Sequence, residues 1–341
     1  METLQRDKTL DIAKGICIIL MVIGHSGCPT YLHDFIYMFH MPCFFFISGW
    51  LLNDRYITDL KTGLIQKAKG SYYPFVKWTL IFLLFHNVFA SMHIYENSYS
   101  WQTSMERIVR AFTMTGSEQL LGGFWFLISL FWASIISLLF LSTLSKHEIV
   151  TENKIRGGVI LTLIIAMLWH YIPIALPQMF GEQTILATAF YLSGYLFKKK
   201  KMEFKPFYAS LLIIPALFAC FMHLAMDTEG WRVLVLYVIA MSAIGGVMSM
   251  SSIVARGKMA PILTYIGSKT LYILVFHFLA FKVVSSFVIQ INCLPINELS
   301  HFPVLEHAIC YLWIIYSLTG IGLPMLVWKL FHPKSMKVWQ R

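Results

Sequence analysis

Apolar runs recur along almost the whole chain, most of them about 17 to 25 residues long, and they limit the fold more than any other feature. An apolar helix of about 20 residues crosses the hydrocarbon core of a bilayer. The composition agrees, because 57% of the residues are hydrophobic and 13% are charged, whereas soluble domains carry roughly 25% charged residues. The runs predict ten membrane-spanning helices, at 9–25, 34–53, 73–92, 121–143, 157–174, 183–197, 207–225, 232–251, 269–291 and 307–331.

We therefore expect an all-α, polytopic integral membrane protein with one transmembrane domain over residues 1–341. Lysine and arginine predict its orientation, since loops rich in these residues stay in the cytoplasm. With a cytoplasmic N-terminus, 21 of the 27 Lys and Arg residues fall on inner segments, and the outer segments hold only Arg107, Arg110 and Arg232. Both termini are then cytoplasmic. The net charge of +10 reflects this topology and attraction to anionic lipid headgroups, and needs no nucleic acid as partner.

The six cysteines suggest no disulfide framework. Four of them lie within apolar runs, where free cysteine behaves as a small hydrophobe. Cys28 and Cys293 fall in loops on the same predicted side, so a disulfide between them is an alternative to two free thiols, although the spacing does not favour it. The sequence contains no CxxC or HExxH motif and therefore supports no metal site.

The outer connection between the third and fourth spans, residues 93–120, contains the stretch WQTSMERIVRAF. Its apolar residues recur at helical spacing, at Trp101, Met105, Ile108 and Phe112. We expect a short amphipathic helix on the outer membrane surface, which either roofs a site or is a simple interfacial loop.

The first span, LDIAKGICIILMVIGH, carries three ionisable residues on one stripe. Lys14 and His25 are eleven positions apart, which at about 100° and 1.5 Å per residue places them on one face about 16 Å apart. Asp11 lies three positions before Lys14, close enough to pair with it. Ionisable groups inside a span are costly and by default mark a site or pathway. The alternative is that Asp11 and Lys14 snorkel to the interface while His25 touches headgroups.

The longer stretch RDKTLDIAKGICIILMVIGH resembles the N-terminal motif of the membrane-bound acyltransferase-3 family, through Arg6, Asp11, Lys14 and His25 in order and spacing. Three later stretches are similar to further family motifs: FHMPCFFFISGWLL (through Phe39, Met41, Pro42, Phe45, Ser48 and Gly49), GGFWFLISLF and GSKTLYILVFH. The histidine directly before Met-Pro, His40, resembles the pattern of the family branch related to fucose O-acetylases. The chain departs from the family in having lysine where arginine is common, which loses a bidentate fork on phosphate; these positions are Lys14, Lys67, Lys69 and Lys77.

The resemblance implies O-acylation, usually O-acetylation, of a cell-surface or envelope saccharide, with cytoplasmic acetyl-CoA or another acyl-CoA as donor and without a metal. It also implies a multi-pass protein of the bacterial inner membrane. His25 would act as the general base, with a covalent acyl-histidine as the competing mechanism, and Asp11 would orient Lys14. The residues expected near acyl-CoA are Arg6, Lys14, Lys67, Lys69, Lys77, Trp125, Ser268 and Tyr272. His40 and His277 are expected near the acceptor.

A transporter or flippase of a saccharide or lipid-linked precursor is the alternative from a different functional class, because it too needs many spans with polar residues inside them. Transporters often contain paired broken helices in their two halves. The sequence shows no such internal repeat, and Asp11 is the one acid that we place inside a span. These observations favour the acyltransferase.

Overall fold

The computed structural model describes residues 8–146, 150–169, 171, 181–305 and 311–331. The regular elements of these residues are all helical, which confirms the predicted all-α class. The α-helices are α1 (Lys8–His25), α2 (Thr30–Tyr37), α3 (His40–Trp50), α4 (Asp54–Thr58), α5 (Leu60–Lys67), α6 (Tyr73–Ser91), α7 (Trp101–Thr113), α8 (Trp125–Lys146), α9 (Glu152–Trp169), α10 (Glu182–Lys199), α11 (Ile213–Phe218), α12 (Arg232–Val254), α13 (Ala260–Ser268), α14 (Thr270–Ile291) and α15 (Leu312–Phe331). A π-helical turn (Ala68–Tyr72) joins α5 to α6, and short 3₁₀ helices cover Gln119–Phe124, Pro206–Leu212 and Ile296–Ser300.

Five helical segments are long and apolar enough to cross a membrane, which agrees with a polytopic membrane protein. They are Leu60–Ser91, Gln119–Lys146, Arg232–Val254, Thr270–Ile291 and Leu312–Phe331. Three further helices that match predicted spans, α1, α9 and α10, have 18 residues each and carry charged residues near their ends. The count of ten spans stays a prediction.

Two predicted spans differ from the structure because hydropathy does not register a break inside an apolar run. The run 34–53 is divided between α2 and α3, with the break at Met38 and Phe39. Pro42 stands in the first turn of α3, where a missing N–H is tolerated. In one continuous helix over 34–53, residue 42 would have to donate to the Met38 carbonyl, and proline has no N–H to do so. The run 207–225 contains only the apolar helical piece Pro206–Phe218, which at about 1.5–2 Å per residue is shorter than the roughly 30 Å of a bilayer core.

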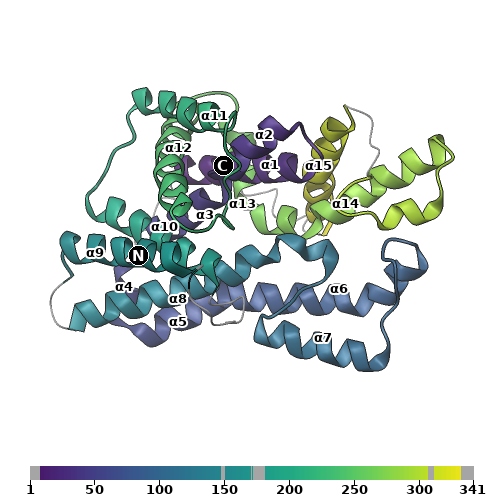
Figure 1. The fold of residues 1–341 in the computed structure, drawn as a ribbon, viewed down its shortest axis with the longest axis horizontal. Helices are drawn as coiled ribbons and strands as arrows, with labels where there is room; N and C mark the ends of the chain where they lie inside the picture. Colours follow the sequence, from purple (N-terminus) through teal and green to yellow (C-terminus); the bar gives the residue numbers. More distant parts are fainter. Residues whose placement is uncertain (1–7, 147–149, 170, 172–180, 306–310, 332–341) are drawn as a thin grey trace.

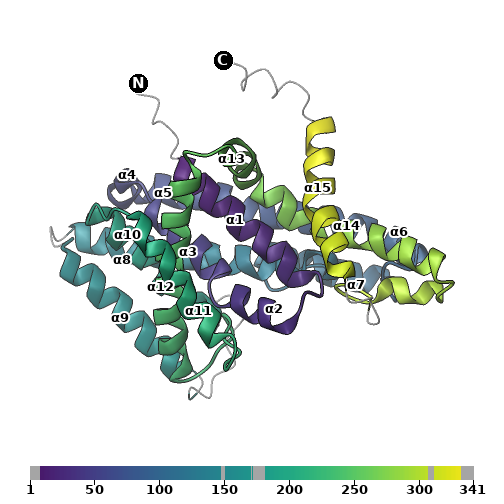
Figure 2. The ribbon, with the colours of Figure 1, turned by 90° about the horizontal axis from the view of Figure 1, so that it is seen from above.

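The helices that carry the motifs quoted above pack around α1. It contacts α13, α3, α12 and α15, while α3 packs chiefly against α10. In Figure 2 the first turn of α1, α13 and the last turn of α15 lie along one side of the molecule, and α2 and α11 lie along the other. Figure 1 shows α5, α6 and α8 running lengthwise beneath this group. The two ends of α1 therefore face opposite sides of the protein.

Pairs of glycines bring helix backbones into direct contact at two of these interfaces. Any Cβ at Gly15 would collide with the Leu263 carbonyl of α13, and one at Gly267 would collide with the Asp11 carbonyl of α1. Gly49 of α3 and Gly194 of α10 are related in the same way. Small residues allow such close approach between helices in membranes. The glycine of the late GSKTLY motif thus serves to seat α13 on the Asp11 turn.

The connection 93–120 contains the predicted amphipathic helix, α7, which begins after Ser100, whose hydroxyl caps it by accepting from the Thr103 N–H at 3.2 Å. This helix packs along α6, and the hydroxyl of Tyr72, the last residue of the π-helical turn before α6, donates to the Phe112 carbonyl at 2.9 Å. Its apolar side is exposed at Trp101 and Phe112. The helix is confirmed, and its place on the outer membrane surface stays a prediction.

Cys28 and Cys293 are free thiols, so the disulfide that their loop positions left open is not formed. Cys28 is half-buried and Cys293 is exposed. Burial raises the pKa of the Cys28 thiol to about 11.

Candidate active site

Two adjoining cavities follow the polar stripe of α1. The first, of about 180 Å³, is lined by Lys14 and is called the Lys14 cavity below. The second, of about 140 Å³, is lined by His25 and is called the His25 cavity. Both are lined by Met21, Met41 and Leu274, so they meet at these three side chains. The stripe predicted from helical spacing therefore borders two adjoining cavities, which together form the path from Lys14 to His25 discussed below.

At the first end of this path, Asp11 and Lys14 form the predicted ion pair, with Nζ 2.7 Å from Oδ1. Asp11 is buried, and the side chain of Lys14 keeps 22% of its exposure. Lys14 is the one cation among the described residues that line this cavity, whose other lining is mostly apolar, for example Phe44, Phe126 and Leu130. A single positive charge at an apolar corridor suits a ligand with an anionic head and a thin, weakly polar arm.

At the other end, the His25 imidazole is held by Tyr37 of α2. The Tyr37 hydroxyl lies 3.0 Å from His25 Nδ1 in a hydrogen bond, and the two rings meet edge to face. Tyr37 is in turn stacked on His33, with ring centroids 3.8 Å apart. Because Nδ1 is engaged by Tyr37, Nε2 is the nitrogen available for reaction. In the tautomer whose Nδ1–H donates to the Tyr37 oxygen, Nε2 carries the lone pair that a base needs.

Two further histidines accompany His25. His40 lines the same cavity, and its Nδ1 donates to the Ile36 carbonyl at 2.8 Å. His277 is fully buried and stacks on His25 with centroids 5.5 Å apart. Its Nδ1 donates to the carbonyls of Ile273 and Leu274 at 3.1 and 3.0 Å, while its Nε2 has no hydrogen-bond partner among the described residues. The three imidazoles predicted from separate motifs are thus gathered at one place.

A model of the acyltransferase domain family matches residues 7–329, which is nearly the whole chain. The chain belongs to the acyltransferase-3 family. It is similar to the nodulation protein NolL of Mesorhizobium japonicum, with 27% identity over 254 residues that cover 69% of this chain and 61% of that protein. It is also similar to the nodulation protein NolL of Sinorhizobium fredii, with 25% identity over 181 residues that cover 50% of this chain and 45% of that protein.

The match thus spans about three fifths of the first relative's length and less than half of the second's. No solved structure matches the chain. The family membership confirms the resemblance seen in the motifs, and the five candidate spans agree with a polytopic membrane protein.

Of the residues expected at acyl-CoA, Lys14 lines the Lys14 cavity and Trp125 lines the His25 cavity, while the others lie outside both cavities or outside the described part of the chain. Arg6 is outside the described residues. The Lys67 ammonium donates to the Tyr191 hydroxyl at 2.7 Å. Lys69 and Lys77 are exposed, and Lys77 lies over the Trp78 ring. Ser268 donates to the Tyr265 carbonyl, and Tyr272 packs edge-on against Trp78.

Three polar residues that border the His25 cavity were not singled out by sequence: Tyr37, Gln183 and Asp227. Tyr37 ends α2 and His40 begins α3, so helical spacing along the run 34–53 does not relate their side chains, and the nearness of Tyr37 to His40 in the sequence was the one available signal. Gln183 and Asp227 come from the start of α10 and from the connection before α12, and no local pattern links either to His25.

Proposed function

We propose that this acyltransferase moves an acyl group, in the simplest case acetyl, from cytoplasmic acyl-CoA to a hydroxyl of a saccharide outside the membrane. The observation that carries the proposal is the path bordered by α1, with a cation at one end and an imidazole at the other. The similarity of His40-Met41-Pro42 to the fucose O-acetylase branch supports a saccharide as acceptor. Family membership makes the transporter alternative unnecessary.

The Lys14 cavity suits the donor. Acyl-CoA is polyanionic at its nucleotide end and has a narrow pantetheine arm that ends in a thioester. Lys14, oriented by Asp11, would attract the phosphates, and Arg6 would add a second positive charge. The apolar lining from Ile18 to Leu274 would receive the arm, so that the thioester reaches His25 without the nucleotide crossing the membrane. No metal is required.

The His25 cavity suits the chemistry. His25 Nε2 would take the proton from the acceptor hydroxyl as its oxygen bonds the thioester carbonyl carbon. The bond from that carbon to sulfur then breaks, and His25 returns the proton to the thiolate, so that the products are the acyl ester and free CoA. General acid–base catalysis of this kind contributes about 10²–10⁴ in rate. We favour this direct transfer over an acyl-histidine, because it needs one base and no second nucleophile.

With both termini cytoplasmic, as the lysine and arginine distribution predicts, the Lys8 end of α1 faces the donor and the His25 end faces the outside. This orientation places transfer at the outer side of a bacterial cytoplasmic membrane. Formation of the carbon–oxygen bond, cleavage of the carbon–sulfur bond and proton transfer would then all occur within the His25 cavity.

The test is acetyl-CoA binding by the purified full chain in detergent, at about 50 and 300 mM salt. Binding should weaken at the higher salt, since exposed charge pairs are screened, and Lys14→Ala should weaken it about tenfold, or about 1.4 kcal/mol. Lys146→Ala is the matched control, because Lys146 is an exposed lysine at the end of α8 that lines neither cavity. If the wild type bound neither acetyl-CoA nor longer acyl-CoAs, the acyl-CoA donor would be refuted and the transporter would become the preferred function.

A further inference from the structure

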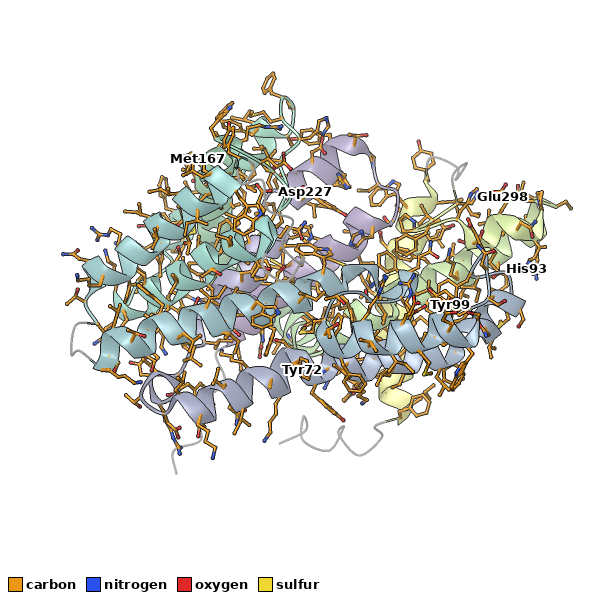
Figure 3. All side chains as sticks on the ribbon, turned by 60° about the horizontal axis from the view of Figure 1, so that its bottom comes forward. Tyr72, His93, Tyr99, Met167, Asp227 and Glu298 are labelled. Atoms are coloured by element: carbon orange, nitrogen blue, oxygen red, sulfur yellow. The ribbon has the colours of Figure 1, made fainter. Side chains whose placement is uncertain are left out.

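A third cavity, of about 380 Å³, opens beside the His25 cavity and is called the vestibule below. It is formed by α2 and by the segment 223–232, and it shares Tyr37, Ala225 and Asp227 with the His25 cavity. Figure 3 shows Asp227 between α2 and the helices that precede and follow its segment. A molecule seated in the vestibule therefore lies next to the reactive histidine, on the side away from Lys14.

The vestibule is a built polar site. Asp34 is buried at 6% exposure and bonds both His33 Nδ1, at 3.3 Å, and His223 Nδ1, at 2.7 Å. The Arg232 guanidinium donates to the His223 carbonyl at 2.6 Å, which ties the segment to the first turn of α12. Thr228 accepts from the Ala225 N–H at 3.0 Å. These bonds hold the rim in place before any ligand binds, which lowers the ordering cost of binding.

The permanent charges of the vestibule are unbalanced. Asp34, Asp227 and Glu229 are carboxylates, and Arg232 is the one guanidinium or ammonium among its described lining residues. Asp227 and Glu229 are exposed at the rim. These carboxylates outnumber the guanidinium and ammonium groups of the lining, so their field disfavours an anion. Carboxylate oxygens, imidazoles and a tyrosine are suitable partners for the hydroxyl groups of an uncharged sugar.

We infer that the vestibule binds the acceptor, and that this acceptor is a neutral saccharide rather than one bearing uronate, sialate or phosphate groups. The inference rests on the proposed function, since it assumes that an acceptor hydroxyl must reach His25. Asp227 is the central residue, because it borders both the vestibule and the His25 cavity. It would bind the sugar unit next to the one that is acylated.

A second polar cleft among the described residues supplies a control position for the vestibule. It is lined by His93, Glu96, Glu298 and His301 and shares no lining residue with the His25 cavity. In Figure 3 His93 and Glu298 lie at the far end of the molecule from Asp227. Glu96 is an exposed carboxylate of that cleft, so Glu96→Gln tests loss of a surface carboxylate away from the vestibule.

The experiment measures binding of two probes, cellotetraose and tetragalacturonate, to the purified full chain by saturation-transfer NMR without any acyl donor. We expect cellotetraose to bind, and tetragalacturonate to bind at least about tenfold more weakly. Asp227→Ala should weaken cellotetraose binding about tenfold, whereas Glu96→Gln should leave it unchanged. Asp227→Lys reverses the charge at an exposed position, and it should reduce the difference in affinity between cellotetraose and tetragalacturonate.

Equal binding of the two probes by the wild type, or no cellotetraose binding, would overturn the assignment of a neutral saccharide. Unchanged cellotetraose binding in Asp227→Ala would remove the vestibule as its site. Acetyl-CoA binding and acetyl transfer are measured on the same samples. Saccharide binding that depends on Asp227, without any acetyl transfer, would support the vestibule as a saccharide site and refute the proposed acyl transfer. Acetyl transfer whose acceptor KM is the same in the wild type and in Asp227→Ala would support the reaction and refute the vestibule as the acceptor site.

Discussion

The Lys14 end of α1 is held by backbone contact, and its His25 end is held by side chains. At Lys14, Gly15 and Gly267 seat the helix directly on α13, and the ion pair forms within a single turn. At His25, the contacts come from α2 and α14, through Tyr37 and His277, and no glycine pair intervenes. The first end is therefore positioned by the packing of two helices, and the second by individual hydrogen bonds and stacked rings.

This difference fits the tasks that we propose for the two ends. Binding a flexible polyanion needs a fixed charge in an apolar corridor, and helix packing supplies that rigidity. Proton transfer needs one imidazole nitrogen aimed within hydrogen-bond reach of its partner. A single side-chain bond, such as that from Tyr37, aims the ring. Substitutions should thus act on stability and donor binding at the first end, and on turnover at the second.

The largest effect is expected for His25→Ala, which should reduce acetyl transfer by about 10²–10⁴ because the general base is lost. Acetyl-CoA binding should stay near the wild-type value, since Lys14 lies at the other end of the path. Radiolabelled acetyl transfer and calorimetric binding measure the two quantities. His93→Asn is the control, because asparagine tolerates the left-handed backbone of position 93, with φ 58°. Undiminished transfer in His25→Ala would remove His25 from the mechanism.

The second prediction establishes which end is outside. In intact cells, a membrane-impermeant maleimide should label the exposed Cys293, since it follows α14 on the side of the His25 end. Cys28 should react about a hundredfold more slowly at neutral pH than a thiol of pKa 9.0, because a pKa raised to about 11 lowers its thiolate fraction by that factor. Its labelling should increase as pH rises toward 11. Labelling of Cys293 only after permeabilisation would reverse the predicted orientation.

Sequence predicted the parts of the site that are local along the chain. Asp11 and Lys14 are one helical turn apart, and Lys14 and His25 share a face, so helical geometry alone brings them to one path. Tyr37 was missed because its bond to His25 joins two helices whose relative placement no periodicity encodes. Asp227 was missed for the same reason, as it stands in a connection rather than a helix.

The family motifs named positions without indicating what each side chain does. Lys67 lies in a region expected to bind acyl-CoA, yet its ammonium is bonded to Tyr191, because proximity along the chain does not determine the direction of a long side chain. Gly267 belongs to a motif that suggests ligand binding, and its visible role is contact with the Asp11 backbone. The apolar run 34–53 concealed a helix break, since the residues at the break, Met38 and Phe39, are themselves apolar.

The third prediction breaks the backbone contact at the Lys14 end. In Gly267→Ala the new methyl group would collide with the Asp11 carbonyl, so α13 must move. Overpacking of this kind costs about 1–3 kcal/mol, and the Tm in detergent and the acetyl-CoA affinity should both fall. Gly157→Ala in α9 is the matched control, because nothing lies within 4 Å of its added Cβ. It should stabilise the helix by up to about 1 kcal/mol. Equal Tm values for the two variants would contradict the close contact.

The smallest effect is expected from the side-chain contact at the His25 end. Tyr37→Phe keeps the ring that stacks on His33 and removes only the hydroxyl bonded to His25 Nδ1. A hydrogen bond of about 0.5–1.5 kcal/mol corresponds to a fall in kcat of about two- to tenfold, while the Tm and the acetyl-CoA Kd should not change. Tyr31→Phe is the control, since its hydroxyl lies on the same helix but donates to the Ala216 carbonyl. If both variants lowered kcat equally, the effect would come from the placement of α2 as a whole and not from the bond between Tyr37 and His25. A loss confined to Tyr37→Phe would make Tyr37 a positioning residue and would separate turnover from donor binding along α1.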